Sequence, residues 1–470
     1  GASGDATESA IAPGGVAEGG AKPAFDASGL PTIVLNGRRI DPAAPIRPQV
    51  LDAARAYLSA PIDLRAAGEA RTFTRAQLGA TVPVGRVVEE IERALRFRTA
   101  LRRLLERAGG EHALPVLVDV GDRMALGRLL AFKNMFDREP APAKYDFGAG
   151  QVRPEEPGRR LSLHEALAAL HDAFEAGASQ LDLRVERIEP GLRLRDVSGA
   201  DFSALLGWYE TPYARIPEKE TRNFNLQHAA SFVDGTIVRP GEALDFNAVV
   251  GERTEVRGFK VAPVIAEGEL IDGIGGGTCQ IASTVFAASF FAGLDLVRRR
   301  PHSRPSSYVL LGLDATVVYP SVNLEVRNPF DFPIAFHVRT AEGKVRVEVR
   351  GARRVHNVTF IRDVYQVQPF QTQTIDVPEW PAGIEAVSQR GINGYRMRRH
   401  RILCERAACV RESAESHYPP TTHIVRRGTN PSLSMDGFPL PAGDTSQPYS
   451  ADRHMMVVQS ATETRILRKP

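Results

Sequence analysis

The strongest constraint on the fold is an uncharged stretch, residues 273–294, which reads GIGGGTCQIASTVFAASFFAGL. Its first third is rich in Gly, Thr and Gln, and its apolar part runs only from Ile281 to Leu294. That length falls well short of the about 20 apolar residues that a bilayer-spanning helix needs. Ile281, Val285 and Phe290 recur at helical spacing, and Gly293 ends the run. The stretch therefore predicts a helix buried inside a folded domain.

Cys279 lies in the first turn of this expected helix, directly after three glycines and Thr278. Gly275, Gly276 and Gly277 let the backbone turn tightly and approach a ligand closely. At a helix N-terminus the dipole and the free N–H groups stabilise a thiolate and can hold an oxyanion. The pattern fits a nucleophilic cysteine, but it also fits a packed, unreactive one, and both readings stay open here.

A thiol nucleophile needs a neighbouring base or cation. His302 lies in a loop bounded by Pro301 and Pro305, which suits the positioning of a ring, and Asp314 follows where it could orient that ring. Both residue types are also common in loops where they bond only to nearby backbone. Three arginines of the same segment would attract a substrate carboxylate, or would simply be solvated; they are Arg299, Arg300 and Arg304.

The two other cysteines, Cys404 and Cys409, lie in an alternating apolar and polar segment. Their spacing suits a hairpin joined by a disulfide, which would imply an oxidising compartment. Free thiols are the alternative. A metal site is disfavoured because no second pair of Cys or His lies at ligand spacing.

The composition excludes few classes of protein. The formal net charge is +3 and the densest basic run, RMRRHR at residues 396–401, contains no aromatic residue. We expect a solvated strand face there rather than a nucleic-acid site. His164 and His171 lie on an amphipathic helical pattern and are expected at the surface, not as metal ligands. No cofactor is expected.

The pattern along the chain predicts an α+β multidomain protein. Residues 1–45 are rich in Gly, Ala and Ser and are expected to be a disordered leader that would follow a removed signal or lipid anchor. Residues 46–195 are helical and α+β, with a helical pattern that ends at Gly109 and a capping box formed by Ser162 and Glu165. A mixed α+β domain is expected at 200–352, a β-rich extension at 353–432 and an extended or disordered Pro/Ser-rich tail at 433–470.

Residues 215–351 resemble a VanW domain, because many separated motifs occur in the family's order. These are Asn223, PGE at 240–242, FN-x-VVG at 246–251, GGG-x-CQ at 275–280, Ser283 with Thr284, R-x-x-HS at 299–303, G-x-DATV at 312–317 and Asn328. The region before them is similar to the peptidoglycan-binding domain that often precedes VanW. The strands after them resemble the β-rich extension that often follows.

The resemblance implies an L,D-transpeptidase of the cell wall. Cys279 would attack the third-residue carbonyl of a tetrapeptide stem, release D-Ala and pass the acyl group to an amine on a neighbouring strand, giving a 3-3 cross-link. His302 would be the base and Asp314 its partner. The remaining site residues would bind substrate or hold the oxyanion; they are Gly276, Gly277, Thr278, Gln280, Ser283, Thr284, Ser303, Arg299 and Asn247.

The same resemblance implies an exported protein of the periplasm or cell envelope whose partners are peptidoglycan stem peptides. Nucleic acid is not expected as a partner, and contact with a membrane is expected only through a removed anchor. Two alternatives remain: a non-catalytic peptidoglycan-binding or wall-assembly protein, and a cysteine L,D-carboxypeptidase in which water replaces the amine.

The chain departs from the family pattern at two places. The family usually has SSTLYNA where this chain has ASTVFAA at residues 282–288, so a Tyr hydroxyl and an Asn amide are missing at Phe286 and Ala287. The usual FSFN is LDFN at residues 244–247.

Overall fold

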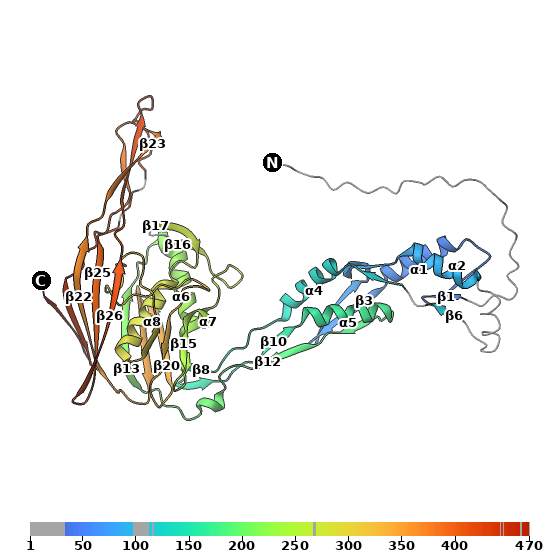
Figure 1. The fold of residues 1–470 in the computed structure, drawn as a ribbon, viewed down its shortest axis with the longest axis horizontal. Helices are drawn as coiled ribbons and strands as arrows, with labels where there is room; N and C mark the ends of the chain where they lie inside the picture. Colours follow the sequence, from blue (N-terminus) through green and yellow to red (C-terminus); the bar gives the residue numbers. More distant parts are fainter. Residues whose placement is uncertain are drawn as a thin grey trace. The chain divides into compact units, whose positions relative to one another are not determined.

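The computed structural model describes residues 33–96, 112–114, 117–266, 269–441, 443–444, 446–460 and 463–469. The chain forms two compact units (Figure 1). The first unit comprises residues 1–140 and 157–189, and the second comprises residues 141–156 and 190–470. The fold is α+β with a β-rich C-terminal part, as predicted.

The first unit combines four helices with short strands among the described residues. The helices are α1 (Ile46–Ser59), α2 (Val84–Arg96), α4 (Asp122–Phe136) and α5 (Leu163–Glu175). Its sheets have the orders β2-β1-β6, β11-β3-β4, β5-β7 and β10-β12. The strands are β1 (Ile33–Leu35), β2 (Arg38–Ile40), β3 (Pro61–Ala66), β4 (Glu69–Thr74), β5 (Ala80–Thr81), β6 (His112–Leu114), β7 (Asp119–Val120), β10 (Gly158–Leu161), β11 (Gln180–Asp182) and β12 (Val185–Ile188).

The first unit agrees with the sequence pattern at α5 and differs from it at the N-terminal strands. Ser162 caps α5, since its hydroxyl accepts a hydrogen bond of 3.3 Å from the backbone N–H of Glu165. His171 contacts Asp122 at 3.0 Å on the exposed side of the unit. The leader predicted for residues 1–45 is too long, because β1, β2 and their turn occupy residues 33–40. Residues 1–32, and the helix end expected at Gly109, lie outside the described residues.

The second unit is built around one buried helix, α8 (Thr278–Ala292), which corresponds to the uncharged stretch of the sequence. It packs against the antiparallel sheet of order β13-β21-β20-β14, mainly on β13 (Ala204–Pro212) and β21 (Lys344–Gly351). Every residue of α8 except Cys279 is buried. Gly293 ends the helix in the left-handed conformation, with φ 84°.

Close packing of α8 on this sheet depends on Gly207. A Cβ atom at Gly207 would lie 2.2 Å from the backbone nitrogen of Ala292. The strand pairing between β13 and β21 shifts register next to Gly207, which indicates a β-bulge. The missing side chain therefore lets the helix backbone lie directly on the strand.

Further short elements surround this core and carry the loops of the candidate site. They are β8 (Lys144–Asp146), β9 (Gln151–Arg153), α6 (Glu220–Val233), β14 (Ile237–Val238), β15 (Ala243–Asp245), α7 (Phe246–Val250), β16 (Val261–Ala266), β17 (Glu269–Ile274), β18 (Asp295–Arg298), β19 (Glu325–Arg327) and β20 (Ile334–Ala341). Strands β15, β19 and β18 form one small sheet, and β16 pairs with β17.

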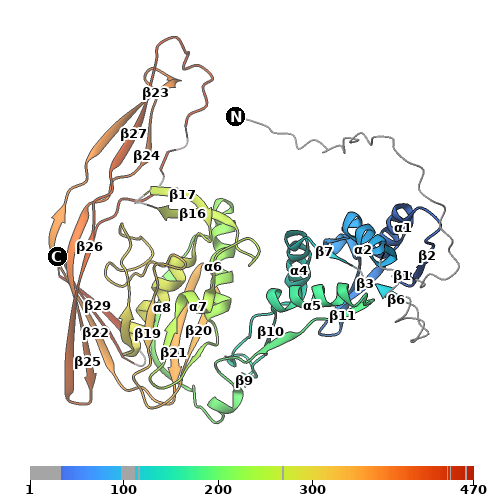
Figure 2. The same ribbon diagram turned by 45° about the vertical axis from the view of Figure 1, so that its right-hand side comes forward.

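The C-terminal extension consists of two sheets (Figure 2). One is antiparallel, with the order β26-β25-β22-β28-β29, and the other has the order β23-β27-β24. The strands are β22 (Asn357–Gln368), β23 (Thr372–Pro381), β24 (Glu385–Gln389), β25 (Gly394–Glu405), β26 (Ala408–Tyr418), β27 (His423–Asn430), β28 (His454–Gln459) and β29 (Thr464–Lys469). The tail at 433–470 was predicted as extended or disordered; its strands β28 and β29 are extended and pair into the first sheet, so the disordered alternative does not apply to them.

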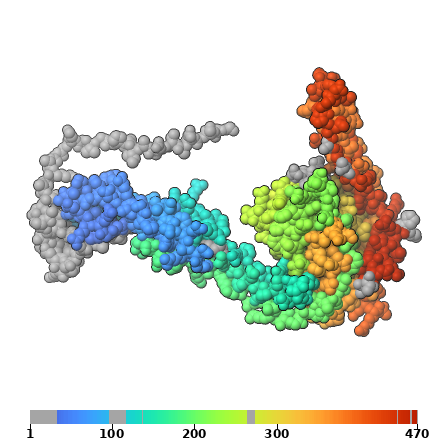
Figure 3. Space-filling model, turned by 180° about the vertical axis from the view of Figure 1, so that it is seen from behind, coloured from blue at the N-terminus to red at the C-terminus, as the bar shows by residue number. Residues whose placement is uncertain are grey.

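The extension packs directly on the rest of the second unit (Figure 3). Strand β22 also packs on α8, and the rings of Phe360 and Phe290 meet edge to face at 5.7 Å. Cys404 and Cys409 form a disulfide between paired positions of β25 and β26. No helix among the described residues is both long and apolar enough to cross a membrane.

Candidate active site

Cys279 is held in the first turn of α8 by the glycine loop that precedes it. Gly275 and Gly277 have positive φ angles of 86° and 108°, which residues with a side chain rarely adopt. Cys279 is half-buried and is the free cysteine of the described residues. Its thiol donates to the carbonyl of Val317 at 3.5 Å and lines a cavity of about 860 Å³. The sulfur is therefore accessible from a space large enough for a peptide segment.

The structure brings Cys279, His302 and Asp314 together. The ring Nδ1 of His302 lies 2.9 Å from Oδ2 of Asp314, and its backbone N–H donates to the same oxygen at 2.8 Å. The other side of the ring contacts the thiol of Cys279. Tyr308 places its hydroxyl 3.4 Å from Nε2 of His302. The carboxylate thus fixes the orientation of the ring toward the sulfur.

The electrostatics of this group favour a charged thiol–imidazole pair. Burial raises the pKa of Cys279, but its hydrogen bond to His302 and the positive charge there lower that pKa more, so that the net pKa lies below 9.0. Burial lowers the pKa of His302, but Tyr308, Asp314 and Cys279 raise it more, and the net pKa lies well above 6.5. Burial raises the pKa of Asp314, but Arg299 and His302 hold it far below its usual range. Both shifts favour thiolate and imidazolium over the neutral pair.

Arg299 does not face the cavity, so its predicted role in attracting a substrate carboxylate is wrong. It is buried and donates to Asp314 twice, from Nη2 to Oδ1 at 2.7 Å and from Nε to the backbone carbonyl at 2.7 Å. It also donates to Ser416 at 2.7 Å and Tyr418 at 3.1 Å, both on β26 of the extension.

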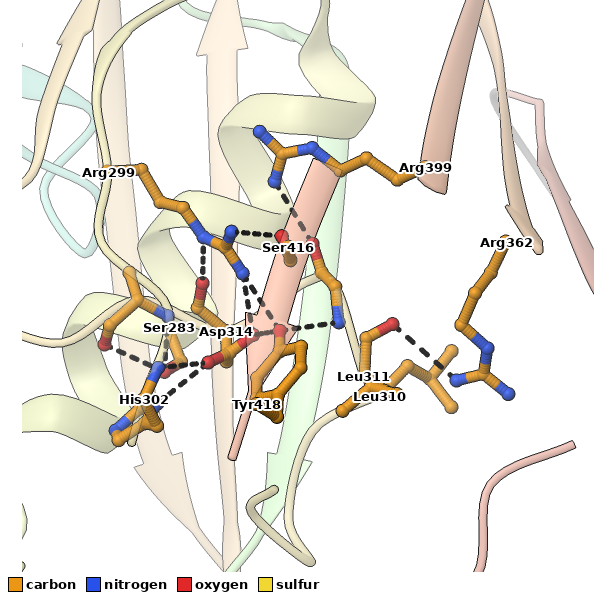
Figure 4. Close-up of polar contacts among 12 residues, drawn as sticks. Ser283, Arg299, His302, Leu310, Leu311, Asp314, Arg362, Arg399, Ser416 and Tyr418 are labelled. Atoms are coloured by element: carbon orange, nitrogen blue, oxygen red, sulfur yellow. Dashed lines mark hydrogen bonds and ion pairs between the residues drawn. The ribbon is translucent and has the colours of Figure 1, made fainter. Parts of the chain in front are cut away.

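Tyr418 donates its hydroxyl proton to Oδ1 of Asp314 and accepts from the N–H of Gly312 at 3.1 Å. Figure 4 shows Asp314 enclosed by Arg299, His302 and Tyr418.

The basic run on β25 was predicted to be a solvated strand face, which is wrong for two of its arginines. Arg399 is buried over the ring of Phe286 at 5.0 Å and donates to the carbonyl of Gly312 at 3.1 Å (Figure 4). Arg401 is buried near Phe290 and donates to the carbonyl of Leu294 at 2.7 Å, just beyond the end of α8. Both side chains therefore fix the extension to the active-site segment.

The predicted oxyanion residues Gly276, Gly277, Thr278 and Gln280 all line the cavity. The side-chain amide of Gln280 is nevertheless fully used, which makes its predicted role as an oxyanion donor wrong. Its oxygen accepts from Arg222 at 2.8 Å, and its nitrogen donates to Thr211 at 3.1 Å and to the carbonyl of Pro212 at 2.9 Å.

The backbone donors of the first turn of α8 differ in their availability. The N–H groups of Thr278 and Gln280 donate to the carbonyls of Gly275 and Gly277. The N–H of Cys279 has no hydrogen bond within the described part of the chain. It is therefore the donor next to the sulfur that could hold an oxyanion.

Three other predicted substrate-binding residues are structural instead. Ser283 exchanges two hydrogen bonds with the backbone of Ala315, at 3.1 and 3.0 Å, and Thr284 bonds to the carbonyl of Gln280 at 2.7 Å. Asn247 accepts a bond of 2.8 Å from Arg253 and does not line the cavity. By contrast, the exposed Ser303 and Arg300 do line it, whereas Arg304 does not.

The cavity also contains residues that the sequence did not identify, Arg222, Glu252, Arg253, Tyr308, Tyr319 and His417. Arg222 lies one position before Asn223 of a recognised motif, and Arg253 lies two positions after Gly251 of another. Their closeness to these motifs in the sequence is the one signal that could have indicated that the two arginines line the site. Within the described residues, no three His, Cys, Asp or Glu side chains gather closely enough to hold a metal ion.

The position where the family usually carries Tyr belongs to the core in this chain. Phe286 is completely buried in α8 and lies under the guanidinium groups of Arg299 and Arg399, at 5.4 and 5.0 Å. Ala287 is equally buried. Neither residue lines the cavity, so these departures from the family pattern leave the walls of the site unchanged.

One family model matches the segment that carries the site. Residues 221–350 match the family model described as VanW like protein. The chain is 39% identical over 140 residues to "Uncharacterized protein YoaR" of Bacillus subtilis (strain 168), covering 30% of this chain and 46% of the relative. It is 29% identical over 132 residues to "Vancomycin B-type resistance protein VanW" of Enterococcus faecalis (strain ATCC 700802 / V583), covering 27% of this chain and 48% of the relative.

The chain thus spans about half the length of the curated relatives it matches. Among solved structures, an "IgA1 Protease G5 domain structure" matches 17% of this chain and 99% of its own chain, with 24% identity and a TM-score of 0.12.

Proposed function

Because this chain contains a VanW-like domain at residues 221–350, we propose that it is a cell-envelope L,D-transpeptidase that forms 3-3 peptidoglycan cross-links through a thioester on Cys279. One observation carries the proposal: the thiol of Cys279 contacts the His302–Asp314 pair and lines a cavity of about 860 Å³. The printed name of one relative, a vancomycin resistance protein, supports a link to the cell wall.

In the first step, the thiolate of Cys279 attacks the carbonyl carbon of the third residue of a tetrapeptide stem. A C–S bond forms and the carbonyl oxygen takes the negative charge, which the backbone N–H of Cys279 stabilises. The imidazolium of His302 then gives its proton to the amide nitrogen of the leaving D-Ala. The C–N bond breaks, D-Ala departs with a free amine, and the oxyanion collapses to a thioester.

In the second step, the side-chain amine of a neighbouring stem attacks the thioester. His302, now neutral, takes a proton from that amine, and a new C–N bond forms while the C–S bond breaks. Sulfur leaves as the thiolate and is again paired with the imidazolium. Asp314 keeps Nδ1 of His302 in place throughout, so that the opposite nitrogen serves both proton transfers.

The proposed location is the cell envelope, outside the reducing cytosol. The disulfide between Cys404 and Cys409 supports an oxidising compartment. Peptidoglycan stem peptides are the proposed partners, and no role for nucleic acid is proposed.

The decisive test incubates the full chain with a tetrapeptide stem and an excess of amine acceptor. We expect D-Ala release, an acyl adduct on Cys279 by intact mass, and a 3-3 linked product by chromatography with mass detection. Cys279→Ala should lose all three signals. The matched control replaces Cys404 and Cys409 by serine; this removes the other two cysteines and should leave the adduct unchanged.

The same experiment separates the alternatives. Release of D-Ala with only tripeptide product would contradict transpeptidation and identify an L,D-carboxypeptidase, since water then resolves the thioester. Binding of the stem without an adduct or release, together with a thiol of ordinary reactivity, would identify a non-catalytic wall-binding protein.

A further inference from the structure

Two partly buried arginines flank the glycine loop that precedes Cys279. Arg222 lies in the first turn of α6, and Arg253 follows α7; both line the same cavity as the thiol. A Cβ atom at Gly277 would lie 2.7 Å from the carbonyl oxygen of Arg222, and one at Gly275 would lie 2.8 Å from Cβ of Arg253. The glycines therefore let the loop pack directly on the two arginines.

The hydrogen-bond partners of both arginines are neutral. Arg222 donates to the side-chain oxygen of Gln280 at 2.8 Å. Arg253 donates from Nη1 to Asn247 at 2.8 Å and to the carbonyl of Gly251 at 2.8 Å, whereas its buried Nη2 has no partner among the described residues. Burial lowers the pKa of Arg253 to about 10, although the nearby thiol of Cys279 raises it in part.

The charges around the cavity are mainly positive. Besides Arg222 and Arg253, the exposed Arg300 and the ring of His302 line it, and Glu252 is the acidic side chain among the described lining residues. Glu252 is exposed and makes no ion pair with either buried arginine in the described structure. The thiol of Cys279 is the anionic neighbour of both arginines. Two partly buried cations thus share one negative charge, and a bound anion would recover part of the free energy that their burial costs.

We propose that Arg222 and Arg253 form a carboxylate-binding subsite that holds a free carboxylate of the acyl donor beside Cys279. Arginine suits this role because its planar guanidinium group can hold a carboxylate through two parallel hydrogen bonds. The identity of the donor rests on the proposed function, but the chemistry of the subsite does not. A stem peptide offers the carboxylate of its leaving D-amino acid, and a diamino acid at the third residue can offer a second one.

The first experiment compares alkylation of Cys279 by iodoacetate and by iodoacetamide on the full chain. In both reactions the thiolate displaces iodide, and the reagents differ in carrying a carboxylate or a neutral amide. We expect the iodoacetate to iodoacetamide rate ratio to exceed that of free cysteine by at least about fivefold, because the reagent's carboxylate binds the subsite. A change in thiol pKa alters both rates equally, so the ratio isolates the contact with the carboxylate.

Substitutions of single arginines show which side chain produces the raised rate ratio. Arg253→Gln should return the ratio to within about twofold of free cysteine, whereas Arg300→Gln, which removes an exposed cation from the same cavity, should change it less. Arg222→Gln provides a second test if Arg253→Gln does not fold. Equal ratios for the protein and free cysteine, or equal effects of Arg253→Gln and Arg300→Gln, would overturn the proposal.

The second experiment identifies which carboxylate binds. Donor peptides are compared that carry a C-terminal acid or amide, and a free or amidated third-residue carboxylate. We expect kcat/KM to fall at least about tenfold when the bound carboxylate is amidated, and this discrimination to disappear in Arg253→Gln. Loss of turnover on every donor with the alkylation ratio preserved would reject the proposed function and leave the subsite standing. Turnover that is indifferent to both amidations would reject the subsite.

Discussion

At the scale of single residues, Cys279 and His302 shift each other's pKa in opposite directions. The net pKa of the thiol lies below 9.0 and that of the imidazole well above 6.5, although burial alone would push each the other way. Both shifts favour the pair of thiolate and imidazolium over the pair of neutral groups. The charged state is thus produced by contact, not by exposure to water.

This pairing predicts the pH dependence of the thiol. The rate of Cys279 alkylation by iodoacetamide should reach its plateau at a lower pH than that of a free cysteine, and it should fall as the pH drops through the lowered pKa of the thiol. His302→Asn removes the positive charge while burial still raises the thiol pKa, so the rate at neutral pH should fall by at least about tenfold. A pH series followed by intact mass measures both effects.

His417→Asn is the matched control for His302→Asn. It removes an imidazole that lines the same cavity but is not among the groups that shift the pKa of Cys279, and it should leave the pH profile almost unchanged. An unmodified protein whose rate follows the ordinary cysteine pKa would contradict the ion pair.

The sequence placed Cys279, His302 and Asp314 in one candidate site, and the structure brings them together, but the sequence misjudged the residues that support them. Arg299 looked like a carboxylate-binding side chain because only its sequence neighbours were visible. Its partners Ser416 and Tyr418 lie 117 and 119 positions away in the chain. A single sequence does not reveal such distant contacts, and the same limit explains why the burial of Arg399 was missed.

At the scale of secondary-structure elements, α8 was the most predictable part of the fold and its surroundings were the least. A charge-free run with Gly at its end specifies a buried helix, and the structure has that helix at Thr278–Ala292. Which strands cover it depends on features such as Gly207, where the strand must lack a side chain. The role of such a glycine can be recognised only when the helix that packs against it is known.

Strand β26 supplies a positioning residue, Tyr418, for the active site. Its hydroxyl donates to Asp314 and accepts from Arg299 and from the N–H of Gly312. Tyr418→Phe should leave two donors and one acceptor without this partner, and we expect it to lower the free energy of unfolding by about 1–3 kcal/mol. Thermal unfolding with a calorimeter measures this loss.

If Tyr418 is only structural, its substitution changes the free energy of unfolding alone. If it positions Asp314, the substitution also changes the pH profile of Cys279 alkylation. Without Tyr418 donating to Asp314, more of the negative charge of that carboxylate is available to His302, so the imidazole pKa should rise and the alkylation profile should shift. Tyr365→Phe is the matched control, since that exposed hydroxyl contacts only the surface residue Glu415 at 3.3 Å. Identical pH profiles for Tyr418→Phe and Tyr365→Phe would show that Tyr418 does not position Asp314.

At the scale of the whole molecule, the segment that matches the family is not a separate folding unit. The hydrophobic core around α8 includes Val358 and Phe360 from β22 and Met455 and Val457 from β28. The hairpin of β8 and β9, which precedes this segment by many residues, also belongs to the second unit. Composition and turn signals suggested boundaries near residues 195 and 352, but a core shared across those boundaries leaves no mark in local sequence.

The shared core predicts the effect of truncating the chain. A chain of residues 1–352 retains the entire family match but loses the strands that cover α8 and the side chains of Arg399, Arg401 and Tyr418. We expect it to keep the thermal transition of the first unit, to lose that of the second unit, and to leave Cys279 with the alkylation rate of a free cysteine, because helix and imidazole are no longer held together. The first unit serves as an internal control for folding.

A chain ending at residue 460 serves as the matched control, since it loses only the edge strand β29, which pairs with β28 alone. It should retain both transitions and the reactive thiol. A cooperative second transition and a lowered thiol pKa in the chain of residues 1–352 would mean that the family segment folds and organises its site without the extension.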